Sequence, residues 1–339
     1  MKLGILTGGG DCPGLNAVIR AVAKKTMFEH KGQLIGIEDA FEGLVEGHWR
    51  ALTWDDVSGI LARGGTILGT TNRSNPFKYG AKGDRSELVI ENYKKLGLDA
   101  LISLGGDGTQ HIAHELSKMG ARMIGVPKTI DNDVIGTEVT FGFDTAVRVA
   151  ADAITDLTST ADAHRRIMVV EVMGRDAGWI ALYAGVAGGA DVILMPEIPY
   201  DLEKVTAAIR ERHKTRRFTI VCVAEGAAAK GQAQERKVGI SGRIAQSLEQ
   251  QLGQEARTVI LGHLQRAGTP TAADRLLATR LGAAAVDLAA AGKFNRMVAV
   301  RDGKVTSIPL EEVAGGTKRV PADHDVLKAA RSMGVIFGD

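Results

Sequence analysis

Short apolar runs recur along the chain, and longer segments with a helical spacing of apolar residues separate most of them. The runs are Leu3–Leu6, Ala100–Leu104, Met123–Val126, Ile167–Val172, Val192–Met195, Thr219–Val223 and Thr258–Leu261. The helical segments are Leu15–Phe28, Thr109–Met119, Ala177–Ala187, Leu202–Lys214, Ile240–Gln251 and Ala272–Ala290. Continuous apolar runs of this length are typical of parallel strands that helices bury on both faces. The pattern therefore predicts an α/β fold built from βαβ units.

The same order of elements predicts two domains, which fits a length of 339 residues. A new helix and a second series of strands start after Phe143, while the segment that starts at Gln265 can return to pack on the first core. We therefore expect one domain made of residues 1–142 plus 265–303 and another made of residues 143–264 plus 304–339. The polar stretch Arg73–Arg85 is expected to form a surface loop.

Composition excludes several classes of function. The 42 Lys and Arg residues nearly balance the 40 Asp and Glu residues, so no overall field favours nucleic acid or an anionic membrane. The two cysteines, Cys12 and Cys222, lack the spacing of a metal site and are typical of a reducing compartment. The sequence contains no long apolar span and no targeting segment. We expect a cytoplasmic protein that binds neither nucleic acid nor a membrane.

Two glycine-rich loops follow strands of the first domain. Thr7–Gly14 opens a helix, so its backbone N–H groups can face an anion with the helix dipole behind them. Gly105–Thr109 follows the strand Ala100–Leu104 in the same way, and its Asp107 can hold Mg²⁺ between phosphates. The alternatives are a tight strand-to-helix turn for the first loop and a helix N-cap for Asp107. Open α/β sheets bind ligands at the carboxyl ends of their strands, so we expect a phosphate site there.

A third loop, Pro127–Asp133, leaves the strand Met123–Val126 and contains two carboxylates, a hydroxyl, an amide and a lysine. A carboxylate near bound phosphates can accept the proton of an attacking hydroxyl group, provided that a short, stiff loop fixes it. Asp131 and Asp133 are the candidates for this base. Because polar side chains gather here at the end of a strand, the loop indicates a binding or catalytic site.

Four segments taken together resemble the bacterial-type phosphofructokinase family. They are Gly105–Thr109, Pro127–Asp133, Met173–Arg175 and Gly262–Arg266, in this order. The resemblance implies two doubly wound, Rossmann-like domains, each with three α/β/α layers, and an active site in the cleft between them. It also implies transfer of the γ-phosphoryl group of Mg·ATP to the C1 hydroxyl of D-fructose 6-phosphate, which gives fructose 1,6-bisphosphate and ADP in glycolysis.

The resemblance assigns residues to the phosphoryl donor and to the transfer step. Gly10, Arg73, Gly106, Asp107, Gly108, Thr109 and Lys128 would line the donor site, with Asp107 on Mg²⁺. Thr129 would contact the transferred phosphoryl group, and Asp131 would be the base. Gly10 and Arg175 would complete the catalytic set, because an arginine can stabilise the charge on the oxygens of the moving group.

The resemblance places the sugar phosphate at the carboxyl ends of strands in the second domain. Met173, Gly174, Arg175 and Glu225 would face the sugar together with Thr129 and Asp131, and Glu225 can accept hydrogen bonds from sugar hydroxyls. A cationic pocket for the 6-phosphate would be built from His164, Arg166, Arg257, His263 and Arg266. In the family, the positions that match Arg166 and Arg257 reach into a neighbouring subunit, so the resemblance implies a homo-oligomer, either a dimer or a tetramer.

Some residues depart from the family pattern and leave alternatives open. Ala267 stands where the family often has Gly. Gly108 matches the ATP-dependent form, whereas Lys128 also occurs in pyrophosphate-dependent members. We expect ATP, because Gly108 leaves space for its α-phosphate and the flexible Lys128 can swing aside. The alternatives are pyrophosphate as the donor, or a sugar-phosphate sensor without turnover. The residues that match the family's effector pocket only in part are Arg20, Lys24, Asp191, Arg216 and Arg217.

Overall fold

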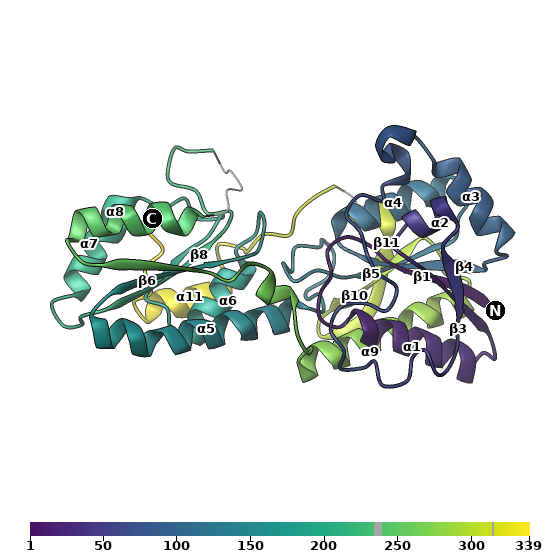
Figure 1. Cartoon of the computed structure of the whole chain (residues 1–339), viewed down its shortest axis with the longest axis horizontal. Coiled ribbons are helices and arrows are strands. Elements are labelled where there is room, and N and C mark those ends of the chain that lie inside the picture. Colours follow the sequence, from purple (N-terminus) through teal and green to yellow (C-terminus); the bar gives the residue numbers. More distant parts are fainter. Residues whose placement is uncertain (234–238, 314) are drawn as a thin grey trace. The chain divides into compact units, whose positions relative to one another are not determined.

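The computed structural model describes residues 1–233, 239–313 and 315–339. The chain divides into two compact units, and Figure 1 labels the elements of both. Unit 1 contains Met1–Thr145 and Arg266–Thr317, and unit 2 contains Ala146–Gln265 and Lys318–Asp339. The chain thus leaves unit 1 within the first turn of a long helix and returns to it directly after Gln265.

Unit 1 is built on a seven-stranded sheet in the order β11-β10-β5-β4-β1-β2-β3. Its strands are β1 (Lys2–Thr7), β2 (Gln33–Ile37), β3 (Trp49–Leu52), β4 (Ala100–Gly105), β5 (Met123–Pro127), β10 (Arg296–Arg301) and β11 (Lys304–Pro309). The two edge strands, β3 and β11, pair antiparallel, and the other strands run parallel. The register pairs Leu3 with Ala100 and Leu101 with Met123, so the carboxyl ends of β1, β4 and β5 lie side by side. The loops that follow these three strands therefore meet at one edge of the sheet.

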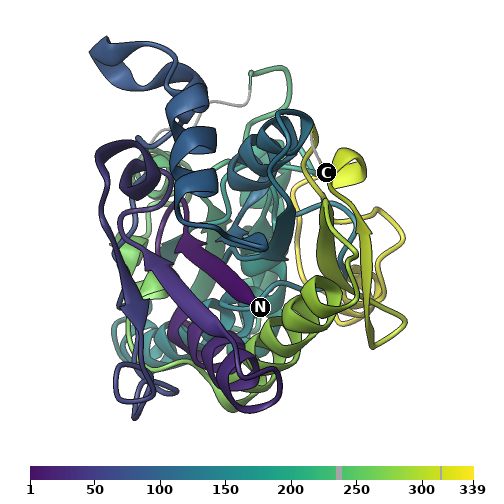
Figure 2. The same cartoon turned by 90° about the vertical axis from the view of Figure 1, so that its right-hand side faces the viewer.

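Helices cover both faces of this sheet. They are α1 (Leu15–Phe28), α2 (Glu42–Glu46), α3 (Ser86–Lys95), α4 (Asp107–Lys118), α9 (Ala272–Ala290) and α10 (Leu310–Val313), with 3-10 turns η1 (Pro76–Lys78) and η2 (Gly80–Lys82). α1 packs against α9 on one face, and α3 lies on the other, as Figure 2 shows. The central strand β4 is fully buried between them, as its continuous apolar run predicted.

Unit 2 contains a four-stranded parallel sheet in the order β7-β8-β6-β9. Its strands are β6 (Ile167–Val172), β7 (Val192–Leu194), β8 (Thr219–Ala224) and β9 (Ala256–Ile260). Its helices are α5 (Phe143–His164), α6 (Trp179–Gly188), α7 (Leu202–Arg212), α8 (Ile240–Leu252) and α11 (Asp325–Ser332), with a 3-10 turn η3 at Gly262–Arg266. In Figure 1, α7 and α8 lie on one face of the sheet and α5, α6 and α11 lie on the other. A buried core that is mostly aliphatic fills the space between the sheet and the α7/α8 layer.

Each of the seven apolar runs coincides with a strand to within two residues, and α1 and α9 have the bounds that their spacing predicted. The expectation of burial was wrong for β9. Arg257, Thr258 and Ile260 are exposed, because β9 forms an edge of its sheet within the described part of the chain. Residues 304–313 and 315–317 lie in unit 1, whereas we expected them in the other domain; the reason is that β11 pairs with β10.

Candidate active site

The loops after β1 and β4 pack tightly against each other at the carboxyl edge of the unit 1 sheet. The Gly8 N–H donates to the Leu104 carbonyl at 2.8 Å. A Cβ atom on Gly8 would lie 2.7 Å from Thr109 Oγ1, and one on Gly105 would overlap the Thr109 side chain. Only glycine therefore allows both loops to close around Thr109. The two glycine-rich loops form one adjoining surface.

Asp107 is the first residue of α4, whose N-cap is Gly106 with no side-chain hydrogen bond, so the interpretation of Asp107 as an N-cap was wrong. Its Oδ1 atom is buried and has no hydrogen-bond partner within the described residues. The same residues contain no group of three or more His, Cys, Asp or Glu side chains that could hold a metal. A single orphaned carboxylate oxygen nevertheless fits Mg²⁺, which takes its other ligands from phosphates and water.

Two further donor-site candidates are open to solvent. Gly108 is exposed, and a Cβ atom there would meet no other heavy atom of the described chain within 4 Å. Arg73 is exposed in the loop that precedes η1. Neither residue is fixed by its surroundings in the way that Thr109 is. Both are therefore accessible to a ligand at this edge of the sheet.

Two cationic side chains converge on Gly10. Lys128 is 4% exposed, and its Nζ donates to the Gly10 carbonyl. The Arg266 guanidinium lies so close to Gly10 that a Cβ atom on this glycine would overlap Arg266 Nη1. Burial lowers the pKa of Lys128 below its ordinary value, and the nearby charge of Arg266 lowers it further. The Lys128 ammonium group is thus buried and bonded to the first glycine-rich loop, and its ability to swing aside stays a prediction.

The loop that follows β5 is buried and well bonded. Asp131 and Asn132 are 3% exposed, and Asp133 is 5% exposed. The Asp131 N–H donates to Thr129 Oγ1 at 3.0 Å, and the Thr129 carbonyl accepts from Thr140 Oγ1 at 2.8 Å. Asn132 has a left-handed φ of 53°, and its Oδ1 accepts from the Thr140 N–H at 3.1 Å. These bonds therefore hold the main chain that carries the buried Asp131 side chain, and a general base requires such a fixed support.

In unit 2, the segment Met173-Gly174-Arg175 follows β6 and has an unusual backbone. Gly174 has a φ of 141° and Arg175 has a φ of 53°. A Cβ atom on Gly174 would lie 2.6 Å from the Ala177 carbonyl oxygen. The Arg175 N–H donates at 2.9 Å to Oε1 of Glu225, which follows the neighbouring strand β8. One oxygen of Glu225, a residue that we expected on the sugar, thus holds the main chain of Arg175.

Sequence reasoning did not select Gln265, which also holds this segment. Its Oε1 accepts from the Met173 N–H at 2.9 Å, and the residue is 0% exposed. It lies in η3 beside the exposed His263. The only sequence signal for Gln265 is its place within Gly262–Arg266, because the contact with Met173 joins residues that are far apart in the chain.

Arg166 and Arg257 lie at the opposite end of the unit 2 sheet from the segment that contains Arg175. Arg166 precedes β6 and Arg257 is the second residue of β9, so both lie at the amino end of the sheet, where both bond to Glu255. Arg166 and then Arg257 lower the pKa of Glu255. The segment with Arg175 follows the carboxyl end of β6, whose six residues span about 20 Å. His164, another of the five candidates for the cationic pocket, is exposed at the end of α5.

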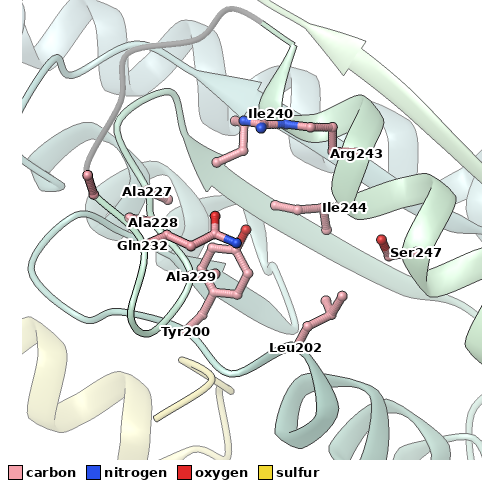
Figure 3. A pocket seen from close by; sticks show the side chains of 11 residues that line it. Tyr200, Leu202, Ala227, Ala228, Ala229, Gln232, Ile240, Arg243, Ile244 and Ser247 are labelled. Atoms are coloured by element: carbon pink, nitrogen blue, oxygen red, sulfur yellow. The ribbon is translucent and has the colours of Figure 1, made fainter.

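Unit 2 also contains a cavity of about 290 Å³. Figure 3 shows Tyr200, Gln232, Arg243 and Ser247 around it, and Ile244 contributes to its apolar lining. The described residues that line it include none of the candidate site residues. The cavity and the candidate site therefore share no described residue.

Adjoining glycine-rich loops and a fixed carboxylate, at the carboxyl ends of parallel strands, place the protein in the class of α/β proteins that bind phosphorylated ligands. Within this class the chain belongs to the phosphofructokinase family, because the family model described as "Phosphofructokinase" matches residues 2–289. The resemblance seen in the sequence motifs is thereby confirmed.

Relatives and solved structures agree with this membership. The chain is 50% identical to an ATP-dependent 6-phosphofructokinase of Spirochaeta thermophila, over 99% of this chain and 97% of that protein. It is 32% identical to the phosphofructokinase of Pichia pastoris in the T-state, with a TM-score of 0.84 over 92% of this chain and 35% of the other. A pyrophosphate-dependent phosphofructokinase from Nitrosospira multiformis, at 22% identity and a TM-score of 0.87 over 100% of this chain and 92% of the other, shows the fold alone. The two-domain α/β fold predicted from the sequence is confirmed.

Proposed function

We propose that this chain is an ATP-dependent 6-phosphofructokinase, which transfers the γ-phosphoryl group of Mg·ATP to the C1 hydroxyl of D-fructose 6-phosphate. The products are fructose 1,6-bisphosphate and ADP. The observation that carries the proposal is the buried, fixed Asp131 on a loop that is bonded to the second glycine-rich loop, through Lys128 N–H and the Gly105 carbonyl at 3.0 Å. The printed names of relatives at 50% identity, which are ATP-dependent 6-phosphofructokinases, support it.

The donor phosphates bind at the adjoining glycine-rich loops. Backbone N–H groups at the start of α4 face the phosphates with the positive end of the helix dipole. Gly106, Gly108, Thr109 and Arg73 line the donor site. The orphaned oxygen of Asp107 would hold Mg²⁺, which when bound would neutralise phosphate charge.

Asp131 accepts the proton of the C1 hydroxyl while the hydroxyl oxygen attacks the γ-phosphorus. The new O–P bond forms as the bond to the bridging oxygen breaks, and ADP leaves with that electron pair. The proton then passes from Asp131 to solvent. Arg175, Thr129 and the N–H of Gly10 stabilise the negative charge on the equatorial oxygens of the moving group.

The acceptor binds at the strand ends of unit 2. The segment Met173–Arg175 and the Glu225 carboxylate contact the sugar, and His263 with Arg266 contacts the 6-phosphate. Arg166 and Arg257 act on the sugar phosphate of a second copy of this chain. Their place at the amino end of the unit 2 sheet, about 20 Å from the carboxyl end, supports this arrangement. The working form is therefore a homo-oligomer, either a dimer or a tetramer.

The surroundings of Gly108 and Lys128 favour ATP over pyrophosphate. The space at Gly108 is open, so an α-phosphate can pass there without a clash. The Lys128 ammonium already binds the Gly10 carbonyl, which reduces its attraction for a bare pyrophosphate. Retention of a fixed base also argues against a sensor that binds sugar phosphate without turnover.

The setting proposed for this reaction is the cytoplasm, where glycolytic sugar phosphates and ATP are available. Over the described ranges, no helix combines the length and the apolar character that crossing a bilayer requires.

The proposal is tested by incubating the purified protein with fructose 6-phosphate, ATP and Mg²⁺ and identifying the products by phosphorus NMR. We expect ADP and a sugar with phosphate on both C1 and C6. Glucose 6-phosphate is the matched control acceptor, and it should give no product. ATP hydrolysis without sugar phosphorylation, or binding of the sugar phosphate without any turnover, would contradict the proposal.

A further inference from the structure

The segment that presents Arg175 requires support because its backbone is strained. Arg175 has a left-handed φ of 53°, which is unfavourable for a residue with a Cβ atom. The Arg175 side chain is exposed and extends from this main chain. The position of the guanidinium therefore depends on how firmly the main chain from Met173 to Arg175 is held.

Two buried or half-buried side chains hold this main chain by accepting its N–H groups. Glu225 accepts from Arg175, and Gln265 accepts from Met173, each at 2.9 Å. A main-chain N–H can only donate, so the amide oxygen of Gln265 must be the atom that faces Met173. The Glu225 contact belongs to the proposed acceptor site, whereas Gln265 has no role in it so far.

The burial of Gln265 indicates that this residue serves mainly to place its amide oxygen against the Met173 N–H. The residue is 0% exposed, and its Nε2 has no hydrogen-bond partner within the described residues. Burying an unpaired amide nitrogen is unfavourable, and an aliphatic side chain of similar size would avoid this loss. An aliphatic side chain would also leave the Met173 N–H without its acceptor.

We infer that Gln265 is a positioning residue for phosphoryl transfer, and the inference rests on the proposed function. Its Oε1 holds the Met173 N–H, and this contact fixes the strained segment so that Arg175 meets the oxygens of the moving phosphoryl group. In this inference Gln265 itself contacts neither the C1 hydroxyl oxygen nor the γ-phosphorus. A misplacement of about 1 Å at a catalytic group lowers the rate by about 10²-fold, so a single lost acceptor has a large effect here.

The direct test compares Gln265→Met, Arg175→Ala and the double variant in a coupled assay with ATP and fructose 6-phosphate. We expect Gln265→Met to lower kcat by about 10- to 100-fold. In the Arg175→Ala background the same change should lower kcat by less than about threefold, because the group that Gln265 positions is already absent. Gln265→Glu, which keeps an acceptor oxygen at the same place, should retain kcat to within about fivefold of wild type.

The control is Gln246→Met, the same chemical change at an exposed position of α8, which should leave kcat and KM unchanged. If Gln265→Met does not fold, Gln265→Asn serves instead, since it keeps the amide but is too short to reach Met173. Equal losses of kcat in the wild-type and Arg175→Ala backgrounds would overturn the inference while the proposed function stands. A wild-type protein that does not phosphorylate fructose 6-phosphate would overturn both.

Discussion

Asp131 and Asp133 are both buried carboxylates of one loop. The Asp131 N–H binds Thr129 Oγ1, which couples the proposed base to the residue that we propose contacts the transferred group. Asn132 lies between them in a left-handed conformation, so the backbone is irregular between the two aspartates. At the scale of single residues, Asp131 therefore stays the proposed base, and Asp133 stays the alternative.

Asp131→Ala should lower kcat by about 10²–10⁴-fold, the usual contribution of a general base, with a much smaller effect on donor binding. Steady-state kinetics with varied ATP, together with calorimetric ATP binding, separates the two effects. Asp133→Ala is the matched comparison on the same loop. Near-full turnover in Asp131→Ala, combined with loss of turnover in Asp133→Ala, would exchange the two roles.

Gly10→Ala tests the contact between the first glycine-rich loop and Arg266. The new Cβ atom would overlap the Arg266 guanidinium, which is the flexible end of a side chain and can move. The variant should fold but raise KM for fructose 6-phosphate about tenfold, because a charge-assisted contact with the 6-phosphate is lost. Gly242→Ala in α8, where the built Cβ meets no described atom within 4 Å, should leave the kinetics unchanged and stabilise the protein by about 0.4–1 kcal/mol. An unchanged KM in Gly10→Ala would show that Arg266 does not contact the sugar phosphate.

At the scale of elements, a buried carboxylate of α9 binds the first turn of α5. Asp274 is 1% exposed, and its Oδ2 accepts from the Thr145 N–H at 2.8 Å and from Thr145 Oγ1 at 2.5 Å. Burial raises the pKa of Asp274 above its ordinary value, and hydrogen bonds from Thr145 offset part of this effect. The folded state therefore binds a proton at Asp274 more tightly than the unfolded state does. The stability from this group is present below the ordinary pKa of 3.8 and is lost as the pH rises through the folded-state pKa.

Asp274→Asn removes this titration and keeps an acceptor oxygen. The free energy of unfolding of the wild type, relative to that of the variant, should fall as the pH is raised from 3.8 through the folded-state pKa. Urea unfolding of both proteins at a series of pH values measures this difference. A difference that rises with pH, or one that stays constant, would show that the pKa of Asp274 is not raised.

Seven of the strands, and the bounds of α1 and α9, could be predicted from the sequence. α9 starts after Thr271, whose side chain accepts from the Asp274 N–H and so provides a local N-cap. The strands β2, β3, β10 and β11 were missed. β3 and β11 are edge strands without a continuous apolar run. β2 and β10 are buried and do carry apolar runs, which sequence reasoning did not select. β9 carries an apolar run but is an edge strand, and sheet order is set by pairings that the sequence of one strand does not reveal.

The same division applies to the candidate site. The loops after β1, β4 and β5 were predicted because residue types and strand ends are local features. Two contacts were not predicted, that of Lys128 with Gly10 and that of Gln265 with Met173. Each joins residues about 90 or more positions apart in the chain. Such contacts follow from packing of the whole unit and leave no periodic pattern in the sequence.

At the scale of the whole molecule, the place of Arg166 and Arg257 makes assembly part of the proposed activity. Arg257→Ala should raise KM for fructose 6-phosphate by about 10- to 100-fold, with a smaller change in kcat, because a ground-state phosphate contact is lost. Arg148→Ala, which removes an exposed arginine of α5 paired with Asp152, is the control and should leave KM unchanged. Sedimentation during turnover should show a dimer or a tetramer. Full activity in a species that sediments as a monomer would contradict a site shared between copies.

The choice of phosphoryl donor depends on one residue, Gly108, on the two glycine-rich loops and on the intact enzyme. We expect kcat/KM for ATP, at saturating fructose 6-phosphate and Mg²⁺, to lie within about 10⁴–10⁸ M⁻¹s⁻¹ and to exceed the value for pyrophosphate. Gly108→Asp should damage ATP use severely and spare any activity with pyrophosphate, because the added carboxylate repels the α-phosphate. A higher kcat/KM with pyrophosphate than with ATP, or no phosphorylation of fructose 6-phosphate with either donor, would contradict the proposed function.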